Sequence, residues 1–142
     1  PHWGPVIFVV VIAVMQVVPY RVQNAAVVTH MKWNSPRTQA LAAAACSDCH
    51  SNHTRRPFYA AIAPVSWVLR NHVDSGRAAL NFDDCRSGGG EDARNAGETI
   101  VEGSMPPSYY TWFGLHPDAR LSAADKRILA EGLRLSLIAS GC

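Results

Sequence analysis

The pattern Cys-x-x-Cys-His occurs once in this chain, at Cys46, Cys49 and His50, and it constrains the fold more than any other feature. It places two thiols and an imidazole within five consecutive residues. In the attachment of a c-type haem, two such thiols bind the two vinyl groups of one porphyrin, and the histidine then reaches the iron. The pattern therefore predicts one covalent haem c on Cys46 and Cys49, with His50 as an iron ligand and the rest of the chain folded around it.

Two other interpretations of the cysteine pair are weaker. A structural zinc site needs four ligands at close spacing, whereas Cys85 and Cys142 stand alone and only His53 is nearby. A redox dithiol usually lies at a helix start in a βαβ context, and no such context is apparent. Haem attachment is therefore the favoured interpretation.

Met105 is the candidate for the second axial position on the iron. It stands in Gly-Ser-Met-Pro-Pro, after a predicted helix end, and the two prolines stiffen the loop that would present its thioether. A methionine at such a site can also serve only as core packing. The competing ligands are His72, which lies on the apolar side of a predicted helix, the loop residues His53 and His116, or an open position.

Four further residues are candidates for contacts with the haem. Arg55 and Arg56 follow the motif closely, and arginine pairs well with carboxylates such as the haem propionates. The alternative for this pair is solvation at the surface. Trp67 and Tyr59 are aromatic side chains that would either form a wall of the haem pocket or belong to the general core.

Composition limits the remaining classes of function. The chain has 142 residues, 48% of them hydrophobic, and a net charge of +2, which fits one domain with a short appendage. Because basic residues are scattered, the sequence predicts no nucleic-acid partner. Four cysteines are too few for a disulfide scaffold. An oxidising compartment would permit a disulfide between Cys85 and Cys142, and a free terminal thiol is the alternative.

The stretch from Trp3 to Tyr20 carries no charge. As a helix it would span roughly 27 Å, close to the roughly 30 Å of a bilayer core, with aromatic residues at both ends. We therefore expect a single transmembrane anchor over residues 1–21, followed by a tether over 22–35. A signal-peptide core and a buried helix are the alternatives.

The rest of the chain, residues 36–142, predicts an all-α haem domain. Expected helices begin at Pro36 and at Pro64, with the second ending or interrupted at Gly76. A third is expected over 91–102 and a last one from Ser122, whose Ser-x-x-Asp pattern is typical of a helix start. The last helix carries two apolar stripes. The segment 104–119 is expected to be a long ordered loop.

Several motifs in order resemble the haem-binding domain family of bacterial cytochrome c-like proteins. They are CSDCHSNHTRRPFY, APVSW, HVDSGRAALNF, GSMPPSYY and LHPDARLS. The resemblance covers about residues 36–138 and implies a cytochrome c-like fold with haem on Cys46, Cys49 and His50, and Met105 as distal ligand. Members of the family often have an N-terminal membrane segment, so the resemblance also implies one here. The chain departs from the family pattern at Phe58, at Cys85 and in its SGGG turn.

Together these features predict a membrane-anchored electron carrier rather than an enzyme. We expect its haem domain on the periplasmic side of a bacterial inner membrane. Its partners would be the lipid bilayer and redox proteins of a respiratory or photosynthetic complex. Two alternatives remain: a haem peroxidase or gas sensor in which Met105 dissociates readily, and a structural subunit with an idle haem.

Overall fold

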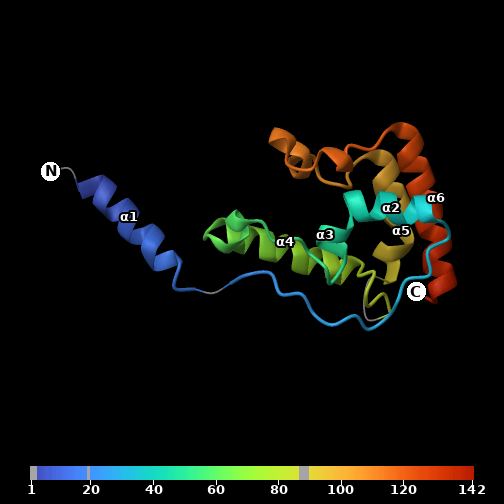
Figure 1. The fold of residues 1–142 in the computed structure, drawn as a ribbon, viewed down its shortest axis with the longest axis horizontal. Helices are drawn as coiled ribbons and strands as arrows, with labels where there is room; N and C mark the ends of the chain where they lie inside the picture. The colour runs from blue at the N-terminus through green and yellow to red at the C-terminus, as the bar shows by residue number, and fades with distance from the viewer. Residues whose placement is uncertain (1–2, 19, 87–89) are drawn as a thin grey trace.

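The computed structural model describes residues 3–18, 20–86 and 90–142, and within these ranges it is helical without strands, as the sequence predicts. Figure 1 shows α2, α5 and α6 gathered at one end, with α1 standing apart at the other. The elements are α1 (Trp3–Met15), α2 (Pro36–Ala45), α3 (Ser47–His50), the 3₁₀ helix η1 (Phe58–Ala61), α4 (Val65–Ala79), α5 (Gly90–Glu102), the 3₁₀ helices η2 (Ser108–Gly114) and η3 (Pro117–Ala119), and α6 (Ala123–Ser140).

Helix α6 forms the centre of the core. Its first stripe, Leu129, Leu133 and Leu137, is buried against residues of α2 and α5, including Leu41 and Ile100. Its second stripe is exposed and consists of Ile128, Leu135 and Ile138. Both stripes predicted from the sequence are therefore present, but only one of them contributes to the core.

Local capping explains where the helices begin. The Ser35 hydroxyl accepts a hydrogen bond from the Thr38 amide at 3.1 Å, directly before α2, and Pro36 occupies the first turn. The Ser122 hydroxyl accepts from the Asp125 amide at 3.1 Å at the start of α6. Both predicted starts are confirmed because a side-chain oxygen satisfies a backbone N–H that the helix leaves unpaired.

Helix α4 differs from its prediction. It continues through Gly76 to Ala79, so the glycine neither ends nor interrupts it. The reason for a glycine here is tertiary, because a Cβ at Gly76 would lie 2.7 Å from the carbonyl oxygen of Cys49. The expected apolar face of this helix is also largely exposed: Val65 and Val68 face solvent, and Val73 is buried.

The predicted loop over 104–119 contains the two 3₁₀ helices η2 and η3. Within η2, Phe113 has a left-handed backbone with φ of 54° although it is not a glycine. A β-carbon is disfavoured there, and the ring of Phe113 is almost fully exposed. This loop is therefore ordered, as predicted, but has more regular structure than its prolines indicate.

The expected membrane helix is shorter in the structure. Helix α1 ends at Met15, and none of the helices in the described ranges is long and apolar enough to cross a bilayer. The proline at position 19 disfavours continuation of the helix, both at its own position and at the residue before it. Just after α1, the Gln16 side chain donates to the Ala63 carbonyl at 3.1 Å and accepts from the Ala63 amide at 3.0 Å.

Residues 22–35, expected as a tether, are extended and lie along the helical domain. Two serines one turn apart on α6 hold them. The Ser140 hydroxyl accepts from the Lys32 amide at 2.8 Å, and the Ser136 hydroxyl accepts from the Asn34 amide at 3.0 Å. The end of this segment is therefore fixed to α6.

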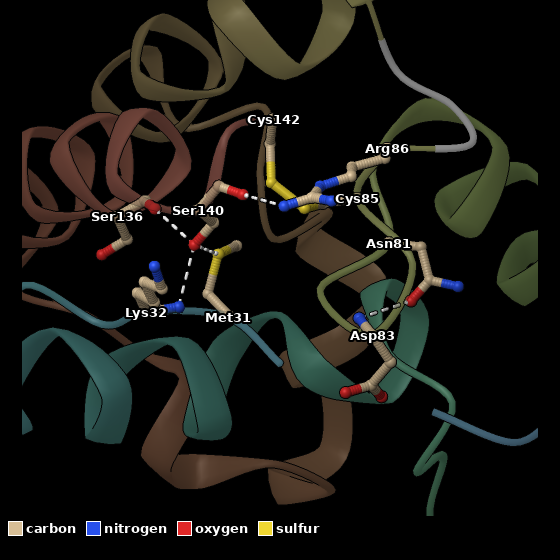
Figure 2. Close-up of a disulfide and its surroundings, with 9 residues drawn as sticks. All are labelled: Met31, Lys32, Asn81, Asp83, Cys85, Arg86, Ser136, Ser140 and Cys142. Atoms are coloured by element: carbon tan, nitrogen blue, oxygen red, sulfur yellow. Dashed lines mark hydrogen bonds between the residues drawn. A yellow bond between two sulfur atoms is a disulfide. The ribbon is translucent and has the colours of Figure 1, made fainter. Parts of the chain in front are cut away.

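A disulfide joins Cys85, in the segment before α5, to Cys142 after the end of α6, with their Cα atoms 5.4 Å apart. Figure 2 shows Arg86 beside this bond, where its guanidinium donates to the Ser140 carbonyl. Gly141 caps α6 in a left-handed conformation and turns the chain back toward Cys85. Of the two alternatives left open by the sequence, the structure has the disulfide.

Candidate haem site

Two adjoining cavities, of about 270 Å³ and 220 Å³, lie between α3, α4, α5 and the loop that carries Met105. Cys46, His50 and Met105 line both of them, and Cys49 lines the smaller one. Together their size falls in the range of roughly 300–1,000 Å³ typical of ligand pockets. The structure therefore brings the four residues predicted to hold the cofactor to one place.

His50 is held as a ligand histidine would be. Its ring Nδ1 donates to the Leu80 carbonyl at 2.9 Å, and its own carbonyl accepts from the Phe82 amide at 2.7 Å. A bond of this kind at one ring nitrogen fixes the tautomer and leaves the lone pair of Nε2 for a metal. Burial lowers the pKa of His50, against the opposing effect of the Leu80 carbonyl, so the imidazole is neutral at pH 7.

The two motif cysteines are free thiols, and both are partly buried. Burial raises the pKa of Cys46 to about 12, with a further contribution from Cys49. The pKa of Cys49 is raised by burial and by the neighbouring Asp48 carboxylate. Redox-active cysteines have lowered pKa values instead. Burial thus keeps both thiols protonated at neutral pH, which argues against a redox dithiol at these residues.

Met105 lies at the cavity wall with 40% of its surface exposed. Its amide donates to the Thr99 carbonyl at 3.1 Å, which fixes the chain immediately after α5. Pro106 and Pro107 follow and line the smaller cavity. The backbone of Met105 is therefore anchored, while its unbranched side chain remains free to turn toward the cavity.

Asp48, inside the Cys-x-x-Cys-His pattern, is the most connected side chain of the site. It is buried, and Arg55 donates to its carboxylate through Nη2 at 2.9 Å and Nε at 3.1 Å. The Tyr110 hydroxyl donates to the same carboxylate at 2.7 Å, and the His116 ring lies 3.8 Å away. Burial alone would raise the pKa of Asp48, but the bonds from Arg55 and Tyr110 outweigh it and lower the pKa.

Four predicted contacts are not brought to the cavities. The Arg55 guanidinium has Asp48 as its partner, and Arg56 is exposed. Trp67 in α4 and Tyr59 in η1 are half-buried, and neither lines the two cavities. The indole N–H of Trp67 is buried without an acceptor among the described residues. The roles of these four residues remain predictions.

Other residues line the site that the sequence did not single out. Phe82, Thr99 and Ile100 form walls of the larger cavity, and Tyr109 and Tyr110 line the smaller one. The smaller cavity also has a wall of α4 that includes His72, the competing ligand candidate, whose Nδ1 lies 3.2 Å from the Tyr109 hydroxyl. The signal available in the sequence was the Tyr-Tyr pair, which one serine separates from Met-Pro-Pro.

Two observations bear on other sites. Among the described residues, no group of three or more His, Cys, Asp or Glu side chains is placed to hold a metal ion, which a zinc site at Cys46 and Cys49 would require.

A larger cavity of about 1,100 Å³ lies between α5 and α6, beside the disulfide. It contains none of the candidate ligands, so its size does not make it the cofactor site.

The residues that are present fit a haem. The cavity walls are mainly apolar, one neutral imidazole has a fixed tautomer, and two thiols and a thioether reach the same space. A family model described as a haem-binding domain matches residues 10–134. The chain therefore belongs to the haem-binding domain family, and its cofactor is haem. Searches of curated proteins and of solved structures found no match.

Proposed function

We propose that this protein is a c-type cytochrome that transfers electrons through one covalent haem. Cys46 and Cys49 would form the two thioether bonds, and His50 and Met105 would bind the iron from opposite sides. The observation that carries the proposal is that all four side chains line one apolar space, with the Nδ1 of His50 already bonded to a carbonyl. When bound, the haem supplies a one-electron redox centre.

The residues of the chain would tune that centre in three ways. His50 keeps its orientation because Leu80 accepts its ring proton. Met105 contributes a weak thioether, and a His/Met pair raises the reduction potential. The apolar walls from Phe82 and Ile100 exclude water and lower the local dielectric. These features favour outer-sphere electron transfer over binding of a substrate at the iron.

We also propose that the haem domain functions outside the cytoplasm and associates with a membrane. The Cys85–Cys142 disulfide supports an oxidising compartment. Helix α1, whose apolar side chains are exposed along its length, supports contact with lipid or with a membrane complex. The redox partners would be proteins of a respiratory or photosynthetic complex.

A peroxidase or gas sensor is the second candidate, and one observation favours it. His72 and Tyr109 lie within hydrogen-bonding distance of each other and line the same cavity as Met105. If the thioether dissociated, this pair would be available to move a proton beside the iron. Tight binding of cyanide or carbon monoxide by the wild-type protein under mild conditions would favour this function over electron transfer.

The test compares Met105→Leu with Met31→Leu. Both substitutions keep the side-chain volume, but Met31 packs against the core away from the cavities, so it serves as the matched control. We expect one covalent haem per wild-type chain by mass spectrometry. In the ferric protein, a far-red band from the Met-to-iron bond should disappear in Met105→Leu alone, and the potential should fall.

Two outcomes would contradict the proposal. If the purified protein carries no covalent haem, attachment through Cys46 and Cys49 is wrong. If covalent haem is present but Met105→Leu leaves the spectrum and potential unchanged, Met105 is not a ligand, and His72→Ala becomes the next variant to measure.

A further inference from the structure

The carboxylate of Asp48 connects the two parts of the chain that carry the proposed iron ligands. Asp48 stands two residues before His50 within α3. The Tyr110 hydroxyl, which donates to it at 2.7 Å, belongs to the loop that begins with Met105. Because the partners are 62 positions apart in sequence, this bond is a tertiary contact between the attachment motif and the opposite ligand's loop.

The loop is fixed on both sides of Met105. Before it, the Met105 amide donates to the Thr99 carbonyl of α5 at 3.1 Å. After it, two prolines lead to Tyr110, whose amide donates to the Pro107 carbonyl at 2.9 Å. Proline restricts the backbone, so a constraint at Tyr110 is transmitted to Met105 over only a few rotatable bonds.

The Tyr110 ring is itself held in position. The His116 ring stacks on it at 3.9 Å between centroids, with only 9° between the planes. Nδ1 of His116 donates to the Tyr110 carbonyl at 2.8 Å. These contacts orient the phenol toward the buried carboxylate, and Tyr110 also lines the smaller cavity beside Met105.

Resting on the proposed function, we propose that Asp48 and Tyr110 are positioning residues that hold Met105 at the distance needed to bind the iron. A methionine on a free loop would lose conformational freedom each time it bound, whereas a loop already fixed at both ends has less to lose. The hydrogen bond between a buried carboxylate and a phenol is of the strong, charge-assisted kind. It therefore favours the arrangement in which Met105 competes well against other ligands.

The simpler explanation of Asp48 is an ion pair with Arg55 that only stabilises the fold. In that pair the Asp48 side chain is only 12% exposed, but the Arg55 side chain is 65% exposed, so solvent screens their attraction. That explanation also does not account for the hydrogen bond from the Tyr110 hydroxyl to Asp48. The two explanations differ in what Tyr110→Phe should do, because this change leaves the Asp48–Arg55 pair in place.

The experiment measures binding of added imidazole to the ferric holoprotein, in which imidazole must displace Met105. The variants are Tyr110→Phe, Asp48→Asn and the double variant, with Tyr109→Phe as comparator. Tyr109 lines the same cavity, but its hydroxyl lies beside His72 instead of Asp48. We expect Tyr110→Phe and Asp48→Asn each to tighten imidazole binding about tenfold, the value of one hydrogen bond to a charged group. Tyr109→Phe should have a smaller effect.

The double variant distinguishes a shared hydrogen bond from two separate effects. If the two side chains act through their common bond, the double variant should bind imidazole about tenfold tighter than wild type, not a hundredfold. Equal effects of Tyr110→Phe and Tyr109→Phe, or no effect of Tyr110→Phe, would overturn the inference. Thermal unfolding of each variant checks that the fold is retained.

The failure of this inference is separable from that of the proposed function. A wild-type protein that shows the far-red band, with Tyr110→Phe unaltered toward imidazole, retains the cytochrome function and overturns the positioning role. A wild-type protein without that band overturns both. A lower reduction potential in Tyr110→Phe, with haem attachment unaffected, would support the positioning role.

Discussion

The disulfide between Cys85 and Cys142 should be one of the largest single contributions to the stability of this protein. It closes a loop with a sequence separation of 57 residues. In the chain-entropy relation, a loop of this length removes about 14 cal/mol/K from the unfolded state, or about 4 kcal/mol at 25 °C. Since small domains have only about 5–15 kcal/mol of stability, loss of the bond should be easily measured.

The variant that isolates the cross-link is Cys142→Ser. Cys142 is exposed, so the substitution removes little packing, whereas Cys85 is 3% exposed and its replacement would also disturb the core. In urea unfolding followed by circular dichroism, the midpoint should fall by about 2 M, given a typical slope of about 2 kcal/mol/M. The haem spectrum of the folded variant should be unchanged, because neither cysteine lines the two cavities of the haem site.

A reductant provides the control. It should lower the midpoint of the wild type toward that of Cys142→Ser and leave the variant unaltered. A shift of less than about 0.5 M, with thiol titration confirming that the wild-type bond is intact, would refute the entropic reasoning. It would mean that the unfolded chain already holds the two segments near each other.

Two further predictions concern glycine packing and acid stability. Gly76→Ala should destabilise the protein by about 1–3 kcal/mol in chemical unfolding, because the new Cβ would lie 2.7 Å from the Cys49 carbonyl oxygen. Gly97→Ala is the control. Its Cβ would lie 3.5 Å from the Ala130 carbonyl oxygen, so this change should be neutral or slightly stabilising. The pKa of Asp125 is lowered by the Ser122 hydroxyl and by Arg37, so its contribution is present above the ordinary value of 3.8 and is lost as the pH falls through the lowered value. Asp125→Asn should therefore be less stable than wild type at pH 7, and the two melting temperatures should converge as the pH falls through the lowered pKa of Asp125; a constant difference would contradict this linkage.

Local signals in the sequence were sufficient for much of the fold. The starts of α2 and α6 depend on Ser35 and Ser122, which act on amides three residues away. The buried stripe of α6 follows from helical periodicity. The four proposed haem ligands also share one cavity, because the pentapeptide brings three of them together and only Met105 had to be placed by the fold.

The remaining features depend on contacts distant in sequence. Gly76 resembles a helix end, yet it is there because α4 approaches the Cys49 backbone. The sequence offers a haem propionate or solvent as the partner of Arg55, and the structure shows a carboxylate partner within the motif itself, Asp48. Residues 22–35 lack any periodic pattern, and distant partners fix them: the Asp83 carbonyl accepts from the amides of Val28 and Thr29, and two serine hydroxyls on α6 hold the end of the segment. Such pairings carry no signal in a single sequence.

The paired hydrogen bonds between Gln16 and Ala63 have a consequence for orientation. Gln16 is the one strongly polar side chain in an apolar stretch. Its side-chain amide donates to the backbone carbonyl of Ala63 and accepts from the backbone N–H of the same residue. A single hydrogen bond would allow α1 to rotate about its own axis, whereas the two bonds to Ala63 resist that rotation. The side of α1 that faces the helical domain is thereby fixed. Any surface that α1 rests on would then determine how the candidate haem site is turned relative to that surface.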